Sequence, residues 1–274
     1  MVGGYAICHY CLSKTLVPKQ CPICGKNMTM IGLGSQRLEE ELAKKLPSAR
    51  VRRIDSDAMA GQDYYGVLRD FADRKIDILA GTQMLAKGLH FPNVTLVGII
   101  SADTALFLPD FRSNERTFQL ISQVAGRAGR SEKGGIVYVQ TFFPNQPAIK
   151  YALENDFKGF VENELSHRKS CFLPPFGRMA IVAMRDAKFD RLSAAAKQMR
   201  LRLDAIISAE KLKITLRGPI EPAVSRIQRQ HRLQFILQAS GPMDLQKLFE
   251  QFRAMAPIRP IVQTQVDIDP IGVL

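Results

Sequence analysis

Two features of membrane and exported proteins are missing from this sequence of 274 residues. No apolar run approaches the roughly 20 residues that span a bilayer, and no signal-peptide pattern opens the chain. The first absence excludes a membrane-spanning protein. We therefore expect a cytoplasmic protein that has no membrane partner.

A phosphate-binding loop is also missing, because the pattern G-x-x-x-x-G-K-[ST] occurs nowhere in the chain. The run Gly32-Leu-Gly-Ser35 has the glycines but lacks the lysine. No Asp-Glu pair follows a strand as a ligand for Mg²⁺. We expect that this chain does not hydrolyse ATP by itself.

Acidic residues are few relative to basic ones. The chain has 26 Asp and Glu against 38 Lys and Arg, a formal charge of +12. This excess favours a polyanion partner, because basic side chains displace the counterions condensed along a phosphate backbone. Ribosome-associated or merely soluble basic proteins have a similar composition. The length suits roughly two domains.

Cysteines are few and clustered. Cys8 and Cys11 form one C-x-x-C pair, Cys21 and Cys24 form another, and Cys171 stands alone. In a reducing compartment such pairs favour metal over disulfides, because a C-x-x-C turn brings two thiolates onto one zinc ion. We predict zinc-binding knuckles in this first segment, residues 1–30, with thiol redox chemistry as the alternative. Cys171 has apolar neighbours and is expected to be buried.

Residues 31–170 alternate helical patterns with apolar strands, which predicts an α/β domain. The strands are nearly all apolar, a pattern typical of a parallel sheet covered on both faces. We expect the hydroxyl of Ser35 to cap the first helix, ahead of acidic first turns. The predicted strands are 51–55, 76–80, 94–100 and 135–141, and the predicted helices are 37–46, 64–72, one that ends at Arg130, and 147–168.

In a parallel sheet, chemistry gathers in the loops that leave the carboxyl ends of the strands. The loop after the second strand contains Gly81, Thr82, Gln83, Lys87 and Gly88. Glycine, hydroxyl, amide and lysine groups hold phosphate oxygens of a nucleotide or of a nucleic-acid backbone. The alternative is an ordinary loop that enters a helix.

The run from Gln123 to Arg130 reads Gln-Val-Ala-Gly-Arg-Ala-Gly-Arg. On a helix Arg127 and Arg130 share a face, and Gly126 and Gly129 let a phosphate come close. Two guanidinium groups placed in this way neutralise the charge that develops on a transferring γ-phosphoryl group. The alternative is a solvated basic helix end.

Two prolines in Leu173-Pro-Pro-Phe176 interrupt any helix and mark the start of a second domain, predicted as residues 171–274. Its pattern follows the order βαββαβ, which predicts a ferredoxin-like α+β domain. The predicted strands are 178–185, 213–217, 232–239 and 261–268, and the predicted helices are 189–208 and 243–255.

A basic stretch, Ser225-Arg-Ile-Gln-Arg-Gln-His-Arg232, lies between the two middle strands of this domain. Its arginines, Arg226, Arg229 and Arg232, are candidates for contact with the phosphate backbone of branched DNA. The alternative is a solvated hairpin tip.

These motifs occur together and in a fixed order. In this combination the chain resembles the second motor lobe of superfamily two helicases, and within them the primosomal protein N′ family of replication-restart DNA helicases. The resemblance extends over nearly the whole chain, from the cysteine pairs to Asp267-Ile-Asp-Pro270. It rests on four runs: Gly32-Leu-Gly-Ser-Gln-Arg-Leu-Glu-Glu-Glu-Leu42, Ile78-Leu-Ala-Gly-Thr-Gln-Met-Leu-Ala-Lys-Gly-Leu-His-Phe-Pro92, Asp110-Phe-Arg-Ser-Asn-Glu-Arg116 and Gln123 to Arg130.

The resemblance implies a RecA-like lobe of an ATP-driven motor that moves 3′ to 5′ on single-stranded DNA and restarts stalled forks. Arg127 and Arg130 match the arginine fingers, and Gln123 matches the polar residue that senses nucleotide across the cleft between the lobes. The glycine-containing loop after the second strand matches the one that couples this cleft to the DNA backbone. Implied partners are single-stranded and branched DNA, single-stranded DNA-binding protein and other primosome proteins.

In the family, the cradle for ATP and Mg²⁺ belongs to a first lobe, so we expect this chain to be the carboxyl-terminal portion of a longer protein. The family also has eight cysteines, in four pairs that interleave over two zinc ions. The two pairs present here then share one ion or hold none. The family usually has Trp after the arginine that matches Arg232, but this chain has Leu233 and no Trp, so we expect no base stacking there.

A noncatalytic zinc-ribbon adaptor that binds nucleic acid or protein is the rival interpretation. The cysteine pairs, the charge and the basic stretch suffice for it. Under that interpretation the run from Gln123 to Arg130 has no functional role.

Overall fold

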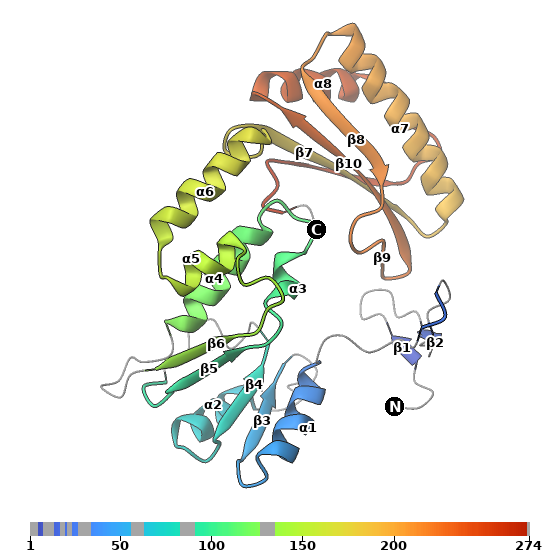
Figure 1. Cartoon of the computed structure of the whole chain (residues 1–274). Helices are drawn as coiled ribbons and strands as arrows, with labels where there is room; N and C mark the ends of the chain where they lie inside the picture. The colour runs from blue at the N-terminus through green and yellow to red at the C-terminus, as the bar shows by residue number, and fades with distance from the viewer. Residues whose placement is uncertain are drawn as a thin grey trace. The chain divides into compact units, whose positions relative to one another are not determined.

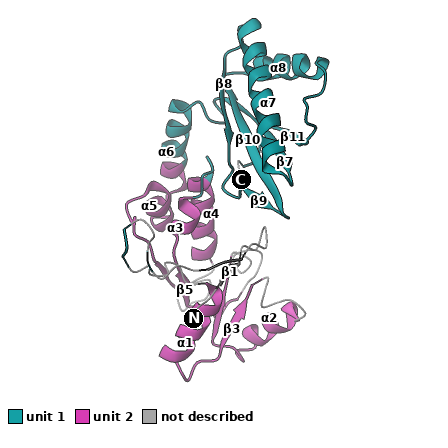
Figure 2. Ribbon diagram, turned by 90° about the vertical axis from the view of Figure 1, so that its right-hand side faces the viewer, with its two compact units in different colours: residues 1–28, 108–112, 161–274 teal, residues 29–107, 113–160 magenta. Residues whose placement is uncertain are grey.

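The computed structural model describes residues 5–7, 14–16, 20, 24–26, 34–55, 63–82, 91–126 and 135–272. The chain forms two compact units, shown in Figure 2. The unit that we call the α/β unit holds residues 29–107 and 113–160, and the C-terminal unit holds 1–28, 108–112 and 161–274. No helix in the described parts combines the length and the apolar content that a bilayer crossing requires.

Two pairs of parallel strands form the centre of the α/β unit (Figure 1). Strand β3 (Val51–Ile54) pairs with β4 (Ile78–Gly81), and β5 (Leu96–Ile99) pairs with β6 (Ile136–Val139). The prediction of parallel strands alternating with helices is confirmed for these residues. Helix α2 (Tyr64–Ala72) has the bounds that were predicted.

The strands are less buried than expected for a sheet that is covered on both faces. Along β5 and β6 the side chains alternate in exposure, and Leu96, Ile136 and Tyr138 are exposed. That expectation was wrong for these strands. A continuous apolar run has no period, so it cannot report whether one face or both faces are covered.

Helix α1 (Ser35–Lys45) begins without the expected serine cap. Gly34 occupies the N-cap position, and the first turn contains no acidic residue. The hydroxyl of Ser35 instead donates to the carboxylate of Asp55, which follows β3. The prediction failed because a carboxylate distant in sequence takes the hydroxyl that a local cap would use.

The helical layer of the α/β unit contains α3 (Asp103–Leu106), α4 (Ser113–Ala125) and α5 (Pro147–Leu153). Helices α4 and α5 pack against each other. The ring of Phe118 on α4 stacks on Phe160, with 4.1 Å between the ring centroids. These contacts fix one side of α4 in the core of the unit.

The predicted helix 147–168 is in fact two helices, α5 and α6 (Phe157–Ser170). Asn155 has a left-handed backbone with φ of +54°, which ends α5. A carboxylate oxygen of Asp156 accepts from the N–H of Gly159 at 2.8 Å and caps the start of α6. The apolar pattern continues through the break and therefore did not reveal it.

The C-terminal unit contains an antiparallel sheet with the strand order β11-β7-β10-β8. The elements follow one another in the predicted βαββαβ order, with the short strand β9 added beside β10. They are β7 (Arg178–Asp186), α7 (Phe189–Ala209), β8 (Ile214–Ile220), β9 (Arg226–Ile227), β10 (Gln230–Ala239), α8 (Pro242–Ala254) and β11 (Gln263–Ile268).

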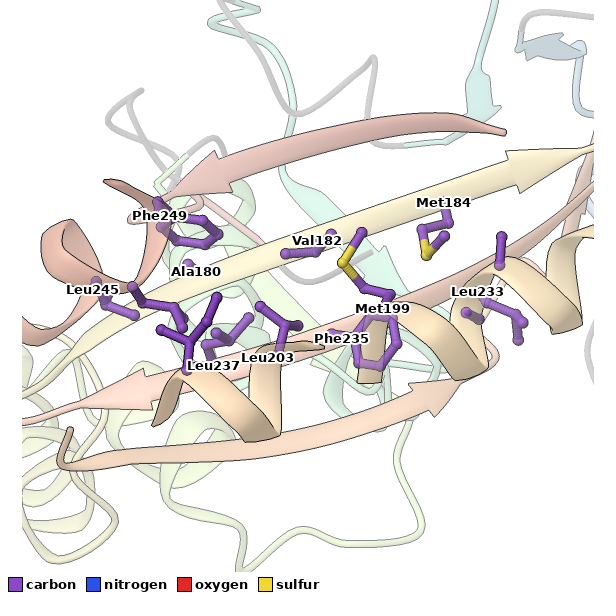
Figure 3. Close-up of a cluster of buried hydrophobic side chains, with 14 of the residues drawn as sticks. Ala180, Val182, Met184, Met199, Leu203, Leu233, Phe235, Leu237, Leu245 and Phe249 are labelled. Carbon is purple, nitrogen blue, oxygen red and sulfur yellow. The ribbon is translucent and has the colours of Figure 1, made fainter. Parts of the chain in front are cut away.

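Helices α7 and α8 cover one face of this sheet and enclose its main core (Figure 3). Val182 and Met184 of β7 and Phe235 and Leu237 of β10 point into this core. Side chains at the alternate positions of the same strands lie on the opposite side, which we call the open face. By strand register it carries Met179, Ile181, Ala183 and Arg185 of β7 and Arg232, Gln234, Ile236 and Gln238 of β10.

Candidate functional site

The helix that leads to the predicted arginine pair is shorter than expected. Helix α4 ends at Ala125, and the N–H of Gly126 bonds the carbonyl of Ser122 at 3.0 Å. The expectation that it runs to Arg130 was therefore wrong. Gln123 lies on α4 with its side chain exposed. The other predicted nucleotide contacts, Arg127, Gly129 and Arg130, lie outside the described residues.

The loop after β4 is described only at its start. Gly81 is the last residue of β4, and Gly81 and Thr82 are both exposed. Because β3 and β4 are parallel and Ile54 is paired with Gly81, the loop leaves the sheet beside Asp55. The remaining members of the predicted phosphate loop, Gln83, Lys87 and Gly88, lie outside the part that the structure describes.

A polar cluster occupies this same edge and was not predicted. Asp55 is buried, with 6% of the residue exposed, and its carboxylate accepts from Ser35 and lies 3.4 Å from Nε of Arg53. Nε of Arg53 is also 3.7 Å from a carboxylate oxygen of Glu39 on α1. The cluster holds the start of α1 against the end of β3. Sequence reasoning missed it because its members are brought together only by the pairing of the helix and strand.

The basic stretch of the C-terminal unit folds as a tight hairpin. Strand β9 pairs with the start of β10, and the two residues of the turn, Gln228 and Arg229, have φ of +48° and +65°. Two consecutive positive φ values are characteristic of the turns that match the twist of paired strands. Arg229 is exposed at the tip, so it is available to a ligand.

The three arginines of the stretch do not share one face of the sheet. Arg226 is the register partner of His231, whereas Arg232 is one residue further along β10 and lies on the open face. The sheet therefore separates Arg226 from Arg232. The sequence could not show this, because the register of β9 and β10 decides it.

A further arginine joins Arg232 on the open face. Arg185 of β7 is its direct register partner, and burial together with the positive charge of Arg185 lowers the pKa of Arg232 below its usual value. Nε of Arg185 donates to Gln263 at 2.7 Å, and Nη1 of Arg232 donates to the carbonyl of Val224 at 3.0 Å. Neither guanidinium forms an ion pair with a described residue. Two facing cations of this kind are suited to an anionic ligand.

The predicted zinc ligands are mostly untested. Cys8, Cys11 and Cys21 lie outside the described residues, and Cys24 is exposed with a free thiol. Over the described ranges, no group of three or more His, Cys, Asp or Glu side chains is placed to hold a metal ion. The zinc knuckles remain a prediction.

The lone cysteine was predicted wrongly. Cys171 is exposed and lies after the end of α6, with Sγ 3.8 Å from Nε2 of His167. Its apolar neighbour Phe172 is itself exposed. Apolar sequence neighbours therefore gave no reliable sign of burial where the helix ends.

Two family models match the chain, one after the other. The helicase conserved C-terminal domain matches residues 19–132, and the primosomal protein N C-terminal domain matches residues 169–271. The first match includes the loop after β4 and the run from Gln123 to Arg130. The second covers the sheet that carries Arg185 and Arg232.

The chain is also similar to curated proteins called replication restart protein PriA. It is 41% identical to that of Bacillus subtilis over 246 residues, 34% identical to that of Rickettsia conorii over 266, and 38% identical to that of Haemophilus influenzae over 266. These alignments cover 89%, 96% and 96% of this chain. They cover only 30%, 40% and 36% of the three relatives, so the chain spans well under half of their length.

Proposed function

Because this chain belongs to the replication restart protein family, and corresponds to its carboxyl-terminal part, we propose that it supplies the second motor lobe of an ATP-dependent DNA helicase. In this proposal the whole protein moves 3′ to 5′ on single-stranded DNA and restarts stalled replication forks in the cytoplasm. Its partners are single-stranded and branched DNA, single-stranded DNA-binding protein and other primosome proteins. The observation that carries the proposal is the order of the two matched domains along one chain.

Within this proposal the arginine run completes a nucleotide site whose other wall belongs to the first lobe. Arg127 and Arg130 act as arginine fingers that stabilise charge on the γ-phosphoryl group of ATP bound with Mg²⁺. Gln123 senses the nucleotide from α4, and Gly126, Gly129 and Gly88 allow the phosphates to come close. The exposure of Gln123 on α4 supports this assignment.

DNA contact is divided between the two units. Gly81, Thr82, Gln83 and Lys87 bind the backbone of single-stranded DNA beside the nucleotide site. In the C-terminal unit Arg226, Arg229 and Arg232 bind phosphates of branched DNA, as the +12 charge of the chain favours. The exposure of Arg229 and the pairing of Arg232 with Arg185 support the second part.

Two structural assignments belong to the same proposal. The cysteine pairs Cys8 with Cys11 and Cys21 with Cys24 bind zinc through thiolates. The C-terminal unit is a ferredoxin-like domain, which the sheet order and the two helices on one face support.

The decisive experiment joins this chain to a first lobe from the family and measures DNA-stimulated ATP hydrolysis. We expect Arg127→Ala or Arg130→Ala to lower turnover by on the order of 10³ while DNA affinity is largely retained. Arg52→Ala, which removes an exposed arginine from β3, is the matched control and leaves turnover unchanged.

The rival interpretation, a noncatalytic zinc-ribbon adaptor, predicts the opposite result. In that case the arginine variants lose DNA binding, and turnover per bound complex does not change. A salt titration of DNA binding by the chain alone gives a second test. A DNA affinity that does not change with salt concentration would remove the electrostatic argument for a phosphate ligand.

A further inference from the structure

A short segment of the chain leaves the α/β unit and returns to it. Residues 108–112 belong to the C-terminal unit, although the residues on both sides belong to the α/β unit. The segment connects α3, which ends at Leu106, with α4, which begins at Ser113. It is not a free loop, because Phe111 and Arg112 contact other residues of the C-terminal unit.

Phe111 fills an apolar site on the open face of the C-terminal sheet. It packs against Met179 and Ile181 of β7, both buried, in a small cluster that also includes Leu173 and Ile236. This cluster is separate from the main core beneath α7 and α8. Phe111 therefore covers the apolar part of a face that the helices leave uncovered.

The Phe111 ring also lies beside a guanidinium that is held in place by other bonds. The Cζ atom of Arg168 lies 5.4 Å from the ring centroid, within the range of a cation–π contact. Nε of Arg168 donates to Glu164 at 2.8 Å in a buried ion pair, and Nη1 donates to the carbonyl of Pro174 at 3.4 Å. Because Arg168 is 8% exposed and paired, it cannot follow the ring if the ring moves.

The residues on both sides of Phe111 are also held by hydrogen bonds. A carboxylate oxygen of the buried Asp110 accepts from the N–H of Arg112 at 2.9 Å, which closes a turn around the ring. Nη1 of Arg112 donates to the carbonyl of Ile271 at 3.3 Å, close to the end of the chain. Asp110, Phe111 and Arg112 therefore form one anchor, which we call the Phe111 anchor.

The anchor adjoins the helix that carries the proposed nucleotide sensor. Helix α4 begins directly after Arg112, at Ser113, which is 6% exposed. It is 13 residues long, carries Gln123, and is followed by the arginine run. A helix transmits displacement along its axis as a rigid element. By holding the first residue of α4, the anchor therefore also influences the position of Gln123.

The open face also brings the anchor close to the paired arginines. Ile181, which contacts Phe111, and Arg185 lie on the same face of β7, four residues and about 13 Å apart. Gln234 and Ala183 lie between these two sites on the same face. A DNA phosphate backbone bound by Arg185 and Arg232 would therefore lie next to the Phe111 site.

We propose that Phe111 is a positioning residue through which the C-terminal unit sets the start of α4, so that DNA on the open face controls ATP hydrolysis at the arginine run. The inference rests on the proposed function for its last step. The element with two states is the Phe111 ring, which is docked on the C-terminal sheet or released from it.

The first test uses the 274-residue chain alone and follows amide hydrogen exchange. We expect Phe111→Ala to speed exchange in the first turns of α4 by about tenfold or more, because opening there no longer requires undocking of the ring. The matched control is Phe107→Ala. It removes an exposed phenylalanine that contacts Phe143 in the α/β unit, and it leaves exchange in α4 unchanged.

Milder variants keep the test decisive if Phe111→Ala does not fold. Phe111→Tyr retains the ring and restores wild-type exchange, whereas Phe111→Leu retains apolar volume without the cation–π contact and gives an intermediate rate. Arg112→Ala removes the bond to Ile271 and also speeds exchange in α4. Exchange equal to the wild type in Phe111→Leu and in Arg112→Ala would overturn the anchor.

The second test joins the chain to a first lobe and measures hydrolysis of ATP with and without DNA. We expect Phe111→Ala to lower the DNA-stimulated kcat by about tenfold. KM for ATP, the rate without DNA and the Kd for DNA stay within about twofold, and Phe111→Tyr restores stimulation. The coupling between the C-terminal unit and ATP hydrolysis would be overturned by a variant that speeds exchange in α4 but keeps full stimulation by DNA. It would also be overturned by a variant that loses stimulation only because it binds DNA more weakly. A wild-type protein with no ATPase would overturn the proposed function instead, and the exchange experiment would still decide the anchor.

Discussion

Arg232 faces Arg185 directly across the β10–β7 pair, with both side chains on the open face of the C-terminal sheet. Like charges in direct register oppose each other, and burial and the charge of Arg185 lower the pKa of Arg232. Guanidinium groups are not deprotonated in folded proteins, so the repulsion across this pair persists. A sheet that keeps such a pair is suited to bind a polyanion there.

This pair gives the first prediction. Arg185→Gln should weaken DNA binding and reduce the slope of log K against log salt by about one, because one phosphate contact is lost. It should leave the thermal midpoint of the chain nearly unchanged, because the change removes a repulsion together with an exposed hydrogen bond to Gln263. The measurements are fluorescence anisotropy at several salt concentrations and thermal unfolding without DNA.

Lys197→Gln is the matched control for this prediction. Lys197 is exposed on α7, which covers the opposite face of the sheet, and its loss should leave the salt slope unchanged. If both variants reduce the slope equally, the chain binds DNA through its overall charge and the open face has no special role.

The second prediction concerns pH and the α/β unit. Arg50, just before β3, donates to both carboxylate oxygens of Asp77, just before β4, at 2.8 Å each. Its backbone N–H donates to Asp77 as well, and these bonds lower the pKa of that carboxyl from its ordinary 3.8. The stabilisation is present above the ordinary pKa and is lost as the pH falls through the lower, folded-state pKa.

Asp77→Asn should therefore lower the thermal midpoint at pH 7, and the difference from the wild type should shrink as the pH falls below 4. Added salt should also reduce the difference, because the pair is largely exposed. Asp73→Asn is the control, since Asp73 lies 3.7 Å from Lys75 in a looser exposed pair. A difference that is constant from pH 7 to pH 3 would show that the carboxylate charge does not stabilise the strand ends.

The third prediction tests the break between α5 and α6. Asp156→Ala should destabilise the chain by about 1 kcal/mol, because the N–H of Gly159 loses its cap. Asp156→Ser should retain most of the stability, and Asn155→Gly should be tolerated because glycine accepts the left-handed backbone. Urea unfolding measures these differences. Equal midpoints for Asp156→Ala and the wild type would mean that the junction is held by packing alone.

Prediction from the sequence succeeded for the elements in which apolar residues recur at regular spacing within the element itself. Helices α2 and α7 and the order of strands in the C-terminal unit came from such patterns, which depend on residues only a few positions apart. The junction at Asn155 was missed because the apolar residues on both sides keep the same helical phase. The cap at Ser35 was wrong because Asp55, 20 residues away, takes the hydroxyl.

The geometry of the candidate sites could be predicted from the sequence less well than the fold. The run from Gln123 to Arg130 and the basic stretch were visible as motifs, but the facing of Arg185 and Arg232 depends on strand register across 47 positions. The docking of Phe111 likewise requires that α6, β7 and the segment 108–112 be folded together. Composition and local period carry no information about such contacts.

The fourth prediction concerns zinc and begins from Cys24, whose thiol is free and exposed. If the two cysteine pairs share one ion, the purified chain should hold about one zinc, because four thiolates complete a tetrahedral site. Cys24→Ser should abolish the bound zinc, since three thiolates hold the ion far less tightly. Metal analysis after dialysis measures the stoichiometry.

Cys171→Ser is the control for this prediction, because Cys171 is an exposed thiol outside the two pairs. Its loss should leave the zinc content unchanged and should remove one equivalent of reactive thiol. A wild-type chain that holds no zinc after reconstitution would contradict the shared site. Each pair would then require cysteines from the part of the relatives that this chain does not span, and joining that part should restore two ions.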